Sequence, residues 1–254
     1  RTDVPRVGDH FEFSQRLGTP GEEVYQRDLV EFLERAQDIS TVLFAPRAER
    51  AGTQTAKFTI RDNLRHRRDI ETAYLAGIRV AKREILIANA YFFPGIRFRH
   101  ALLDAARRGV AVTLLLQAKV EYPLLHFASR ALYGQLVGAG IAIQEYHRSF
   151  LHAKVAVIDD RWATVGSSNI DPYSLLMARE ANVFVRDARF ADALRAELTA
   201  MIVDGARPVD PKRWLGRSLL SKAMNWIAYG IVRAGMGLLG YGGNEWWGGR
   251  PRKR

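Results

Sequence analysis

Apolar strands and amphipathic helices alternate through the middle of the chain. The run AKFTIRDN from residue 56 is typical of a strand and loop, and residues 69–83 carry apolar side chains at the spacing of one helix face. REILIANAYFFPG predicts a buried strand that ends at Pro94. Helices are predicted at 97–108 and 124–137, each closed by glycine and followed by an apolar strand, VAVTLLLQ and IAIQEY respectively. This order predicts a layered α/β domain.

Beyond residue 146 the pattern changes to neighbouring strands. LHAKVAVID and RWATVGS, joined by a short turn that begins at Asp159, predict an antiparallel hairpin. Asp171 and Pro172 are typical of a helix start, ANVFV predicts a last strand, and residues 188–203 predict a last helix. Because so many strands are apolar throughout, we expect a mixed β-sheet flanked by helices on both faces.

The two ends of the chain differ from this central region. Residues 1–56 are mixed, with a helical pattern at 24–36 and a polar, glycine-bearing linker, RAERAGTQT. Residues 206–254 form an apolar and basic extension, in which SLLSKAMNWIAYGIVRAGMGLLGY has helical spacing. Arg233 and four glycines interrupt the roughly 20 apolar residues that a membrane-spanning helix needs. Two interpretations stay open, an interfacial or re-entrant segment and a helix docked on a domain at 57–205.

Charge and composition narrow the possible partners. The net charge of +11 points to anionic partners, and both nucleic acid and acidic phospholipid headgroups qualify. The 48% hydrophobic content is enough for a sizeable core. The absence of cysteine excludes disulfides and thiolate metal sites. The chain opens on Arg1 without a signal-peptide pattern, and we expect that residue 1 is not the natural start of the polypeptide.

The residues with the clearest chemistry lie in the stretch from Phe150 to Asn182. His152 and Lys154 are two apart in a predicted strand, so they are expected to share a face. An imidazole beside a fixed positive charge suits chemistry on a phosphate. The spacing His-x-Lys, four residues, Asp, six residues, Gly-Ser-x-Asn fixes six identities, which occur by chance about once in 10⁸ starting positions. The pattern is therefore specific.

Four further residues of this stretch receive roles from their positions. Ser167 and Asn169 share a face if the strand continues through the turn, and both can donate to phosphoryl oxygens. Asp159 lies an odd number of residues from His152 and near the hairpin turn, which favours a structural role over a catalytic one. Glu180, at the start of the last strand, either orients a histidine or forms a surface salt bridge.

These motifs resemble those of the phospholipase D superfamily. Residues 57–187, including RDNLRHRRDIE, IANAYFFPG, ARRGV, HAKVAVIDDRWATVGSSNIDP and EANVFV, resemble the C-terminal half of the bacterial cardiolipin synthase B family. The resemblance implies a phospholipase D-like fold and a two-step transfer through a covalent phosphohistidine, without a metal or other cofactor. It groups His152, Lys154 and Asp159 as catalytic residues, with His152 as the general acid and base. Lys154, Ser167 and Asn169 are assigned to the substrate phosphate, and Glu180 to a supporting position.

The resemblance also implies a substrate, a cellular location and another half of the active site that this sequence does not contain. The reaction of the family forms cardiolipin from two phosphatidylglycerol molecules at the bacterial inner membrane, where this chain would be peripheral or membrane-associated. Such an enzyme needs two facing motifs, yet His152 alone of the six histidines is followed two residues later by lysine. The expected partners are therefore anionic phospholipid, the membrane surface and a first-motif half, supplied by the same longer chain, which we favour, or by a second copy.

Two other functions remain under consideration. A homodimeric, metal-independent phosphodiesterase acting on DNA or RNA is compatible with the net charge, and RHRR at 65–68 could serve it. Arginine clusters of that length are more often solvated faces, which disfavours nucleic acid as the partner. A non-catalytic lipid-binding role is the third possibility, because half an active site can bind phosphate without turnover.

Overall fold

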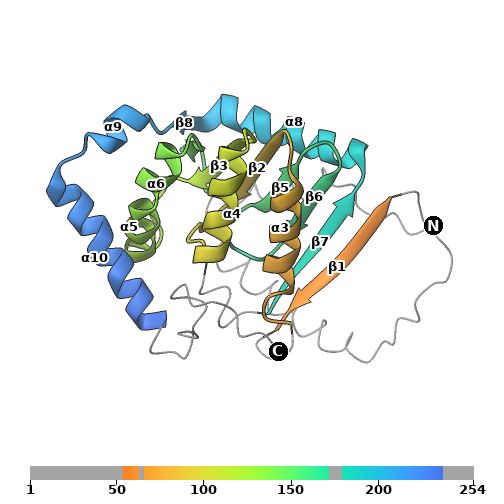
Figure 1. Ribbon diagram of the computed structural model, residues 1–254, viewed down its shortest axis with the longest axis horizontal. Coiled ribbons are helices and arrows are strands. Elements are labelled where there is room, and N and C mark those ends of the chain that lie inside the picture. Colours follow the sequence, from red (N-terminus) through yellow and green to blue (C-terminus); the bar gives the residue numbers. More distant parts are fainter. Residues whose placement is uncertain (1–53, 63–65, 172–178, 237–254) are drawn as a thin grey trace, which may run out of the picture. The chain divides into compact units, whose positions relative to one another are not determined.

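The protein is described here by a computed structural model, which covers residues 54–62, 66–171 and 179–236 (Figure 1). Its centre is one eight-stranded sheet in the order β1-β7-β6-β5-β2-β3-β4-β8. The helices predicted at 24–36 and from Asp171-Pro172 lie outside the described residues. The strands are β1 (Thr55–Arg61), β2 (Glu84–Asn89), β3 (Ala111–Gln117), β4 (Ala142–Tyr146), β5 (Lys154–Ile158), β6 (Trp162–Gly166), β7 (Glu180–Arg186) and β8 (Ala206–Pro208).

The sheet is mixed, as the order of elements predicted. β2, β3 and β4 are parallel to one another, and every other neighbouring pair is antiparallel. β5 and β6 form the predicted hairpin, with Val155 opposite Val165 and Ile158 opposite Trp162. The strand predicted for LHAKVAVID is shorter than expected, because β5 begins only at Lys154 and His152 precedes it.

Helices cover both faces of this sheet (Figure 1). One face is covered by α3 (Asp69–Val80), α4 (Ile96–Arg107), α5 (Pro123–Ala131) and α6 (Tyr133–Gly138), and the other by α8 (Ala188–Gly205). The prediction of one continuous helix over 124–137 was wrong, because the structure has two helices there, α5 and α6, separated at Leu132. The helix predicted at 188–203 is α8, and the Asp187 side chain caps its start by accepting a hydrogen bond from the Phe190 N–H at 2.8 Å.

The two hydrophobic cores explain the continuous apolar strands. All five residues of β5 are buried. Ala156 and Ile158 belong to the core under α3 and α4, whereas Val155 and Val157 pack toward α8. Successive side chains of a strand point to opposite faces, so a strand covered on both sides must be apolar at every position. This confirms the predicted α/β class with helices on both faces.

The residues that follow α8 add one strand to the sheet and two helices that pack on the domain. β8 adds an eighth strand beside β4, pairing Ala206 with Tyr146. α9 (Pro211–Leu215) brings Trp214 against Tyr133, with ring centroids 5.0 Å apart, and α10 (Leu219–Met236) packs on α5. The described part of the extension is thus docked on the domain, one of the two interpretations left open. Among residues 54–62, 66–171 and 179–236, no helix combines the length and hydropathy needed to span a bilayer.

Candidate active site

The predicted site residues gather at one edge of the sheet, where several strand ends meet. Asn89, the last residue of β2, pairs with Lys154, the first residue of β5. At the same edge β6 ends at Gly166, and the Ser167 N–H donates to the Ala181 carbonyl at 2.9 Å. Antiparallel neighbours place the end of one strand beside the start of the next. The start of β5 therefore lies beside the turn that follows β6.

The segment after this turn is fixed to the end of β2. Ile170 forms an isolated parallel bridge with Phe92, and its carbonyl accepts a hydrogen bond from the Phe93 N–H at 2.7 Å. The Ile170 N–H donates to the buried side-chain oxygen of Asn89 at 3.1 Å. Asn169 and Asp171 flank this bridge. The structure thus positions Asn169 through its neighbours, although β6 does not continue as a strand in the way that the shared-face argument assumed.

Lys154 is a buried cation with several carboxylates around it. Its side chain is 6% exposed, and its ammonium group donates to the His152 carbonyl at 3.1 Å. Burial lowers the pKa of Lys154 to about 8, and the negative charges of Glu180, Asp171 and Glu121 act in the opposite direction. At neutral pH the ammonium group is mostly charged. It can oppose the negative charge of a bound phosphodiester.

His152 is accessible to solvent at the same edge. Partial desolvation of its ring and then the charge of Lys154 lower its pKa, while Glu121 raises it. The imidazole is therefore mainly neutral at pH 7 and able to accept a proton. A bound phosphodiester anion would raise the pKa again, because a negative charge stabilises the imidazolium.

Glu180 contacts Ser167. The Ser167 hydroxyl donates to the Glu180 carboxylate and accepts a hydrogen bond from the Ala181 N–H at 3.1 Å. Burial raises the pKa of Glu180, against the effects of Ser167, Arg61 and Lys154. In the described part of the chain no hydrogen bond joins Glu180 to His152. The role of Glu180 in orienting a histidine stays a prediction, and its observed contact orients Ser167.

Gly166 permits the close approach of β6 and β7 that this contact requires. A Cβ atom at Gly166 would lie 2.3 Å from the Asn182 side chain and 2.4 Å from the Ala181 carbonyl oxygen. Both are far inside ordinary contact distance, and one is backbone that cannot rotate away. Glycine at this position of the motif is thus a packing requirement that brings Ser167 beside Glu180.

Sequence reasoning missed several residues at this edge. Tyr91 and Glu121 follow the carboxyl ends of β2 and β3, and the Tyr91 hydroxyl donates to the Glu121 carboxylate. Asp171 is 2% exposed and Arg61, opposite Glu180 across β1 and β7, is 1% exposed. The position of Tyr91 and Glu121 was an available signal, because α/β sheets carry their sites beyond the carboxyl ends of parallel strands.

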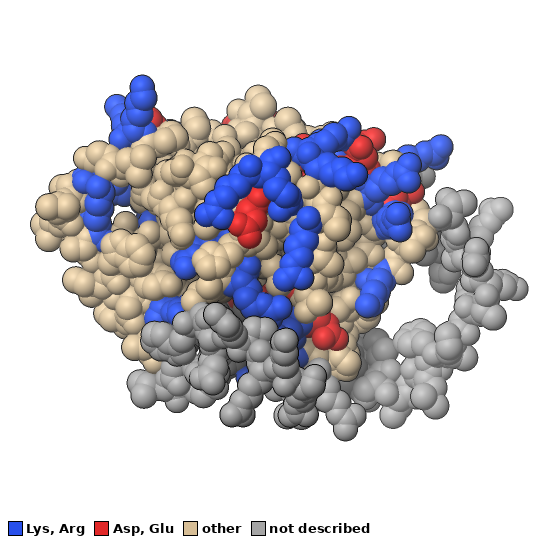
Figure 2. All heavy atoms as spheres, viewed as in Figure 1, with Lys and Arg blue, Asp and Glu red and all other residues tan. Residues whose placement is uncertain are grey.

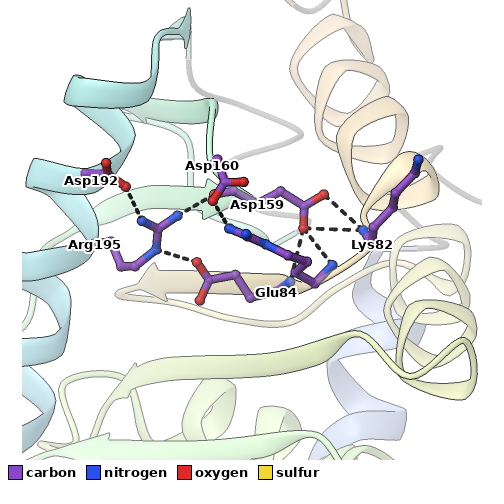
Figure 3. Close-up of polar contacts among 7 residues, drawn as sticks. Lys82, Glu84, Asp159, Asp160, Asp192 and Arg195 are labelled. Atoms are coloured by element: carbon purple, nitrogen blue, oxygen red, sulfur yellow. Dashed lines mark hydrogen bonds and ion pairs between the residues drawn. The ribbon is translucent and has the colours of Figure 1, made fainter.

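Asp159 follows the last residue of β5, whereas Lys154 is the first residue of that strand. The Asp159 carboxylate accepts hydrogen bonds from the backbone N–H groups of Lys82, Arg83 and Glu84 at 3.0, 2.8 and 3.1 Å (Figure 3). Arg195 from α8 bonds the Asp159 carbonyl and the Glu84 carboxylate. The structure therefore separates Asp159 from the two residues with which the resemblance grouped it, and its contacts support a structural role.

Asp159→Ala is expected to lower the free energy of unfolding by roughly 2 kcal/mol, because three N–H groups lose their acceptor and alanine disfavours the positive φ of 48°. Chemical denaturation measures this change. Asp160→Ala is the matched control. It removes only an exposed contact with Arg83 and should cost less than about 1 kcal/mol. Equal losses in the two variants would contradict the structural role.

The same prediction has a pH dependence. Burial by itself would raise the pKa of Asp159, but the backbone hydrogen bonds outweigh it and hold the pKa below its usual value. The stabilisation is therefore present above the unfolded pKa of about 3.9 and is lost as pH falls through the lower folded pKa. The stability difference between the protein and Asp159→Ala should shrink at acid pH.

Comparisons with known proteins find relatives of this chain. The family model described as "Cardiolipin synthase, PLD-like domain" matches residues 74–202. Cardiolipin synthase B of Salmonella typhi is 44% identical over 190 residues, which are 75% of this chain and 46% of that protein. The chain thus spans about half the length of the curated relatives it matches.

Solved structures share the fold at low sequence identity. Nuc of Salmonella typhimurium, a phospholipase D family member, superposes with a TM-score of 0.52 at 18% identity, over 62% of this chain and 99% of that one. The phosphatidylserine synthase of Haemophilus influenzae superposes with a TM-score of 0.57 at 11% identity, over 88% of this chain and 55% of that one. At these identities the likeness shows the fold alone.

Proposed function

Because the chain belongs to the phospholipase D-like cardiolipin synthase family, we propose that it supplies the second half-site of a phosphatidyltransferase. The reaction forms cardiolipin and glycerol from two phosphatidylglycerol molecules. The observation that carries the proposal is an accessible, mainly neutral His152 beside the buried ammonium group of Lys154. The relatives named as cardiolipin synthase B supply the choice of substrate.

The proposed reaction has two steps with His152 as the proton carrier. In the first, a histidine of the first-motif half forms an N–P bond with phosphatidylglycerol, the P–O bond to glycerol breaks, and His152 gives its proton to the leaving oxygen. In the second, neutral His152 takes the proton from a hydroxyl of another phosphatidylglycerol. The oxygen of that hydroxyl forms a P–O bond as the N–P bond breaks, and the free histidine returns.

The other residues at this edge of the sheet would bind the substrate phosphate or hold a phosphate-binding residue in position. Lys154 lies where it would oppose the negative charge on the nonbridging oxygens as five-coordinate phosphorus forms. The Ser167 hydroxyl and the Asn169 amide are the neighbouring hydrogen-bonding groups, and Glu180 holds Ser167 in place. We assign Lys154, Ser167 and Asn169 to phosphate binding and Glu180 to positioning.

The proposed setting is the surface of the bacterial inner membrane. Members of this family act on phospholipids as dimers or with two half-sites. The first-motif half would come from the same longer polypeptide or from a second copy. The net charge of +11 suits a surface of anionic phospholipid, with which the chain would associate peripherally.

A nuclease function is not favoured. The relatives that are 44–45% identical are named as cardiolipin synthases. The likeness to Nuc is at 18% identity and concerns the fold. An experiment distinguishes the third possibility, a lipid-binding protein without catalytic activity. That role predicts vesicle binding that persists in His152→Ala and no transfer activity in the unmodified protein.

A chimera tests the proposal. The matched residues of this chain replace the corresponding part of Salmonella typhi cardiolipin synthase B, and the chimera is expressed in cells that lack cardiolipin synthases. Conversion of labelled phosphatidylglycerol to cardiolipin is expected, with loss of that activity in the His152→Ala chimera. A folded chimera that makes no cardiolipin, or one that is as active with alanine at residue 152, would overturn the proposal.

A further inference from the structure

A cavity of about 240 Å³ lies between α5–α6 and the α9–α10 segment. It shares no lining residue with the edge that carries His152. Arg130, Trp214, Arg217, Lys222, Asn225 and Trp226 are among the residues that line it, and none of its described lining residues is acidic. A cavity with this lining favours an anionic ligand.

Two of the cations at this cavity have no carboxylate partner in the described part of the chain. The Arg217 guanidinium lies over the Trp214 ring, 4.4 Å from its centroid. The Lys222 ammonium group donates to the Leu215 carbonyl at 2.7 Å, which leaves two of its three donors. Arg130 differs because Glu145 neutralises it. The excess positive charge of the cavity therefore comes from Arg217 and Lys222.

Asn225 adds a buried polar group. Its side chain is 7% exposed and lines the same cavity, yet its amide forms no hydrogen bond with any described residue. The amide can therefore donate to a ligand in the cavity. An amide and two cations around one space are the donors that a phosphate group accepts from.

An exposed apolar surface begins at the cavity with Trp226, which lines it and is 54% exposed. Leu219 lies seven residues before it on the same side of α10 and is 83% exposed, and Leu220, Met224, Ile227 and Ile231, 52% to 74% exposed, extend this surface around the helix away from the cavity. Figure 2 shows some Lys and Arg at the left of the view, near α9 and the adjoining end of α10, within a surface made mostly of other residues. Apolar side chains beside cations are typical of a helix that lies at an anionic lipid surface.

We propose that this cavity binds the phosphodiester headgroup of an anionic phospholipid, with the acyl chains leaving it past the exposed Trp226 ring toward Leu219. The site goes beyond the proposed function because it lies apart from the transfer site and holds the domain at a lipid surface. It needs no chemistry at His152. Its failure and the failure of the proposed function can therefore be told apart.

The test uses the full chain and the indole N–H resonances of Trp214 and Trp226, assigned with Trp→Phe variants. Short-chain phosphatidylglycerol below its micelle concentration should shift both signals saturably, in the protein and equally in His152→Ala. Short-chain phosphatidylcholine and inorganic phosphate should bind at least about tenfold more weakly, the first because it has no net charge and the second because it has no acyl chains. Equally strong binding of either would overturn the lipid assignment.

Matched variants locate the site. Arg217→Gln/Lys222→Gln should weaken phosphatidylglycerol binding at least about tenfold, and so should Asn225→Asp, which places a negative charge in the cavity. Lys212→Gln/Arg213→Gln removes the same charge from α9 outside the cavity lining and should change affinity less than about twofold. Equal losses in the two double variants would reduce the effect to overall charge and overturn the site.

A further variant tests the apolar side of α10 against a contact between copies. Leu220→Ser/Ile227→Ser should lower binding to vesicles that contain phosphatidylglycerol, with an unchanged sedimentation mass. Unchanged vesicle binding together with a lower mass would make this side an interface between copies and overturn the proposal.

Discussion

Replacing His152 with alanine is expected to lower phosphatidyl transfer by roughly 10²–10⁴-fold, the usual contribution of a positioned general acid and base. The expectation rests on its place at the sheet edge, accessible to substrate and beside Lys154. Its lowered pKa leaves the ring ready to take the proton of an attacking hydroxyl. The measurement is kcat for cardiolipin formation in the chimera, since the proton transfer occurs after the substrate is bound.

Two controls make this result specific to proton transfer. His100→Ala changes an exposed histidine of α4 and should leave kcat within about twofold. Thermal unfolding of His152→Ala should match the parent, because an exposed side chain without a hydrogen bond in the described residues adds little to stability. A folded His152→Ala protein with unchanged kcat would remove His152 from the mechanism.

Replacing Lys154 with methionine is expected to lower kcat/KM by roughly 10²–10³-fold, the cost of removing one preorganised donor to a developing negative charge. Methionine keeps the length and apolar stem of the buried side chain, so the fold should tolerate it. The removal of the ammonium charge should also raise the pKa of His152, because that charge is one of the causes that lower it. Titration of the His152 ring by NMR measures this second effect.

The pKa of Lys154 sets an alkaline limit on substrate binding. With a pKa of about 8, most of the ammonium charge is present at pH 7 and about a tenth remains at pH 9, so KM should rise roughly tenfold between them. Lys154→Arg keeps its charge throughout this range and should flatten the dependence, at the cost of altered geometry. A KM that does not change over this range in the unmodified protein would contradict the role of the Lys154 charge.

The sequence by itself determined the class of the domain and the motif. The period of two in β5 was hidden because Val155 to Ile158 are all apolar, and this continuity correctly indicated a strand covered on both sides. Glycines at 109 and 138 marked the ends of predicted helices to within a few residues. The spacing of His152, Lys154, Ser167 and Asn169 predicted phosphate chemistry, because it is a property of the chain order alone.

Only the tertiary structure decided which of these residues meet. Asn89 and Lys154 lie far apart in the chain and become neighbours through the pairing of β2 with β5. The pairing of β2 with both β3 and β5 also brings Glu121, which follows β3, near His152. A local sequence pattern predicts the conformation of a segment, but it does not specify which strand pairs with that segment or in which register. For the same reason the docking of α10 on α5, and the cavity beside it, could be read only from the folded chain.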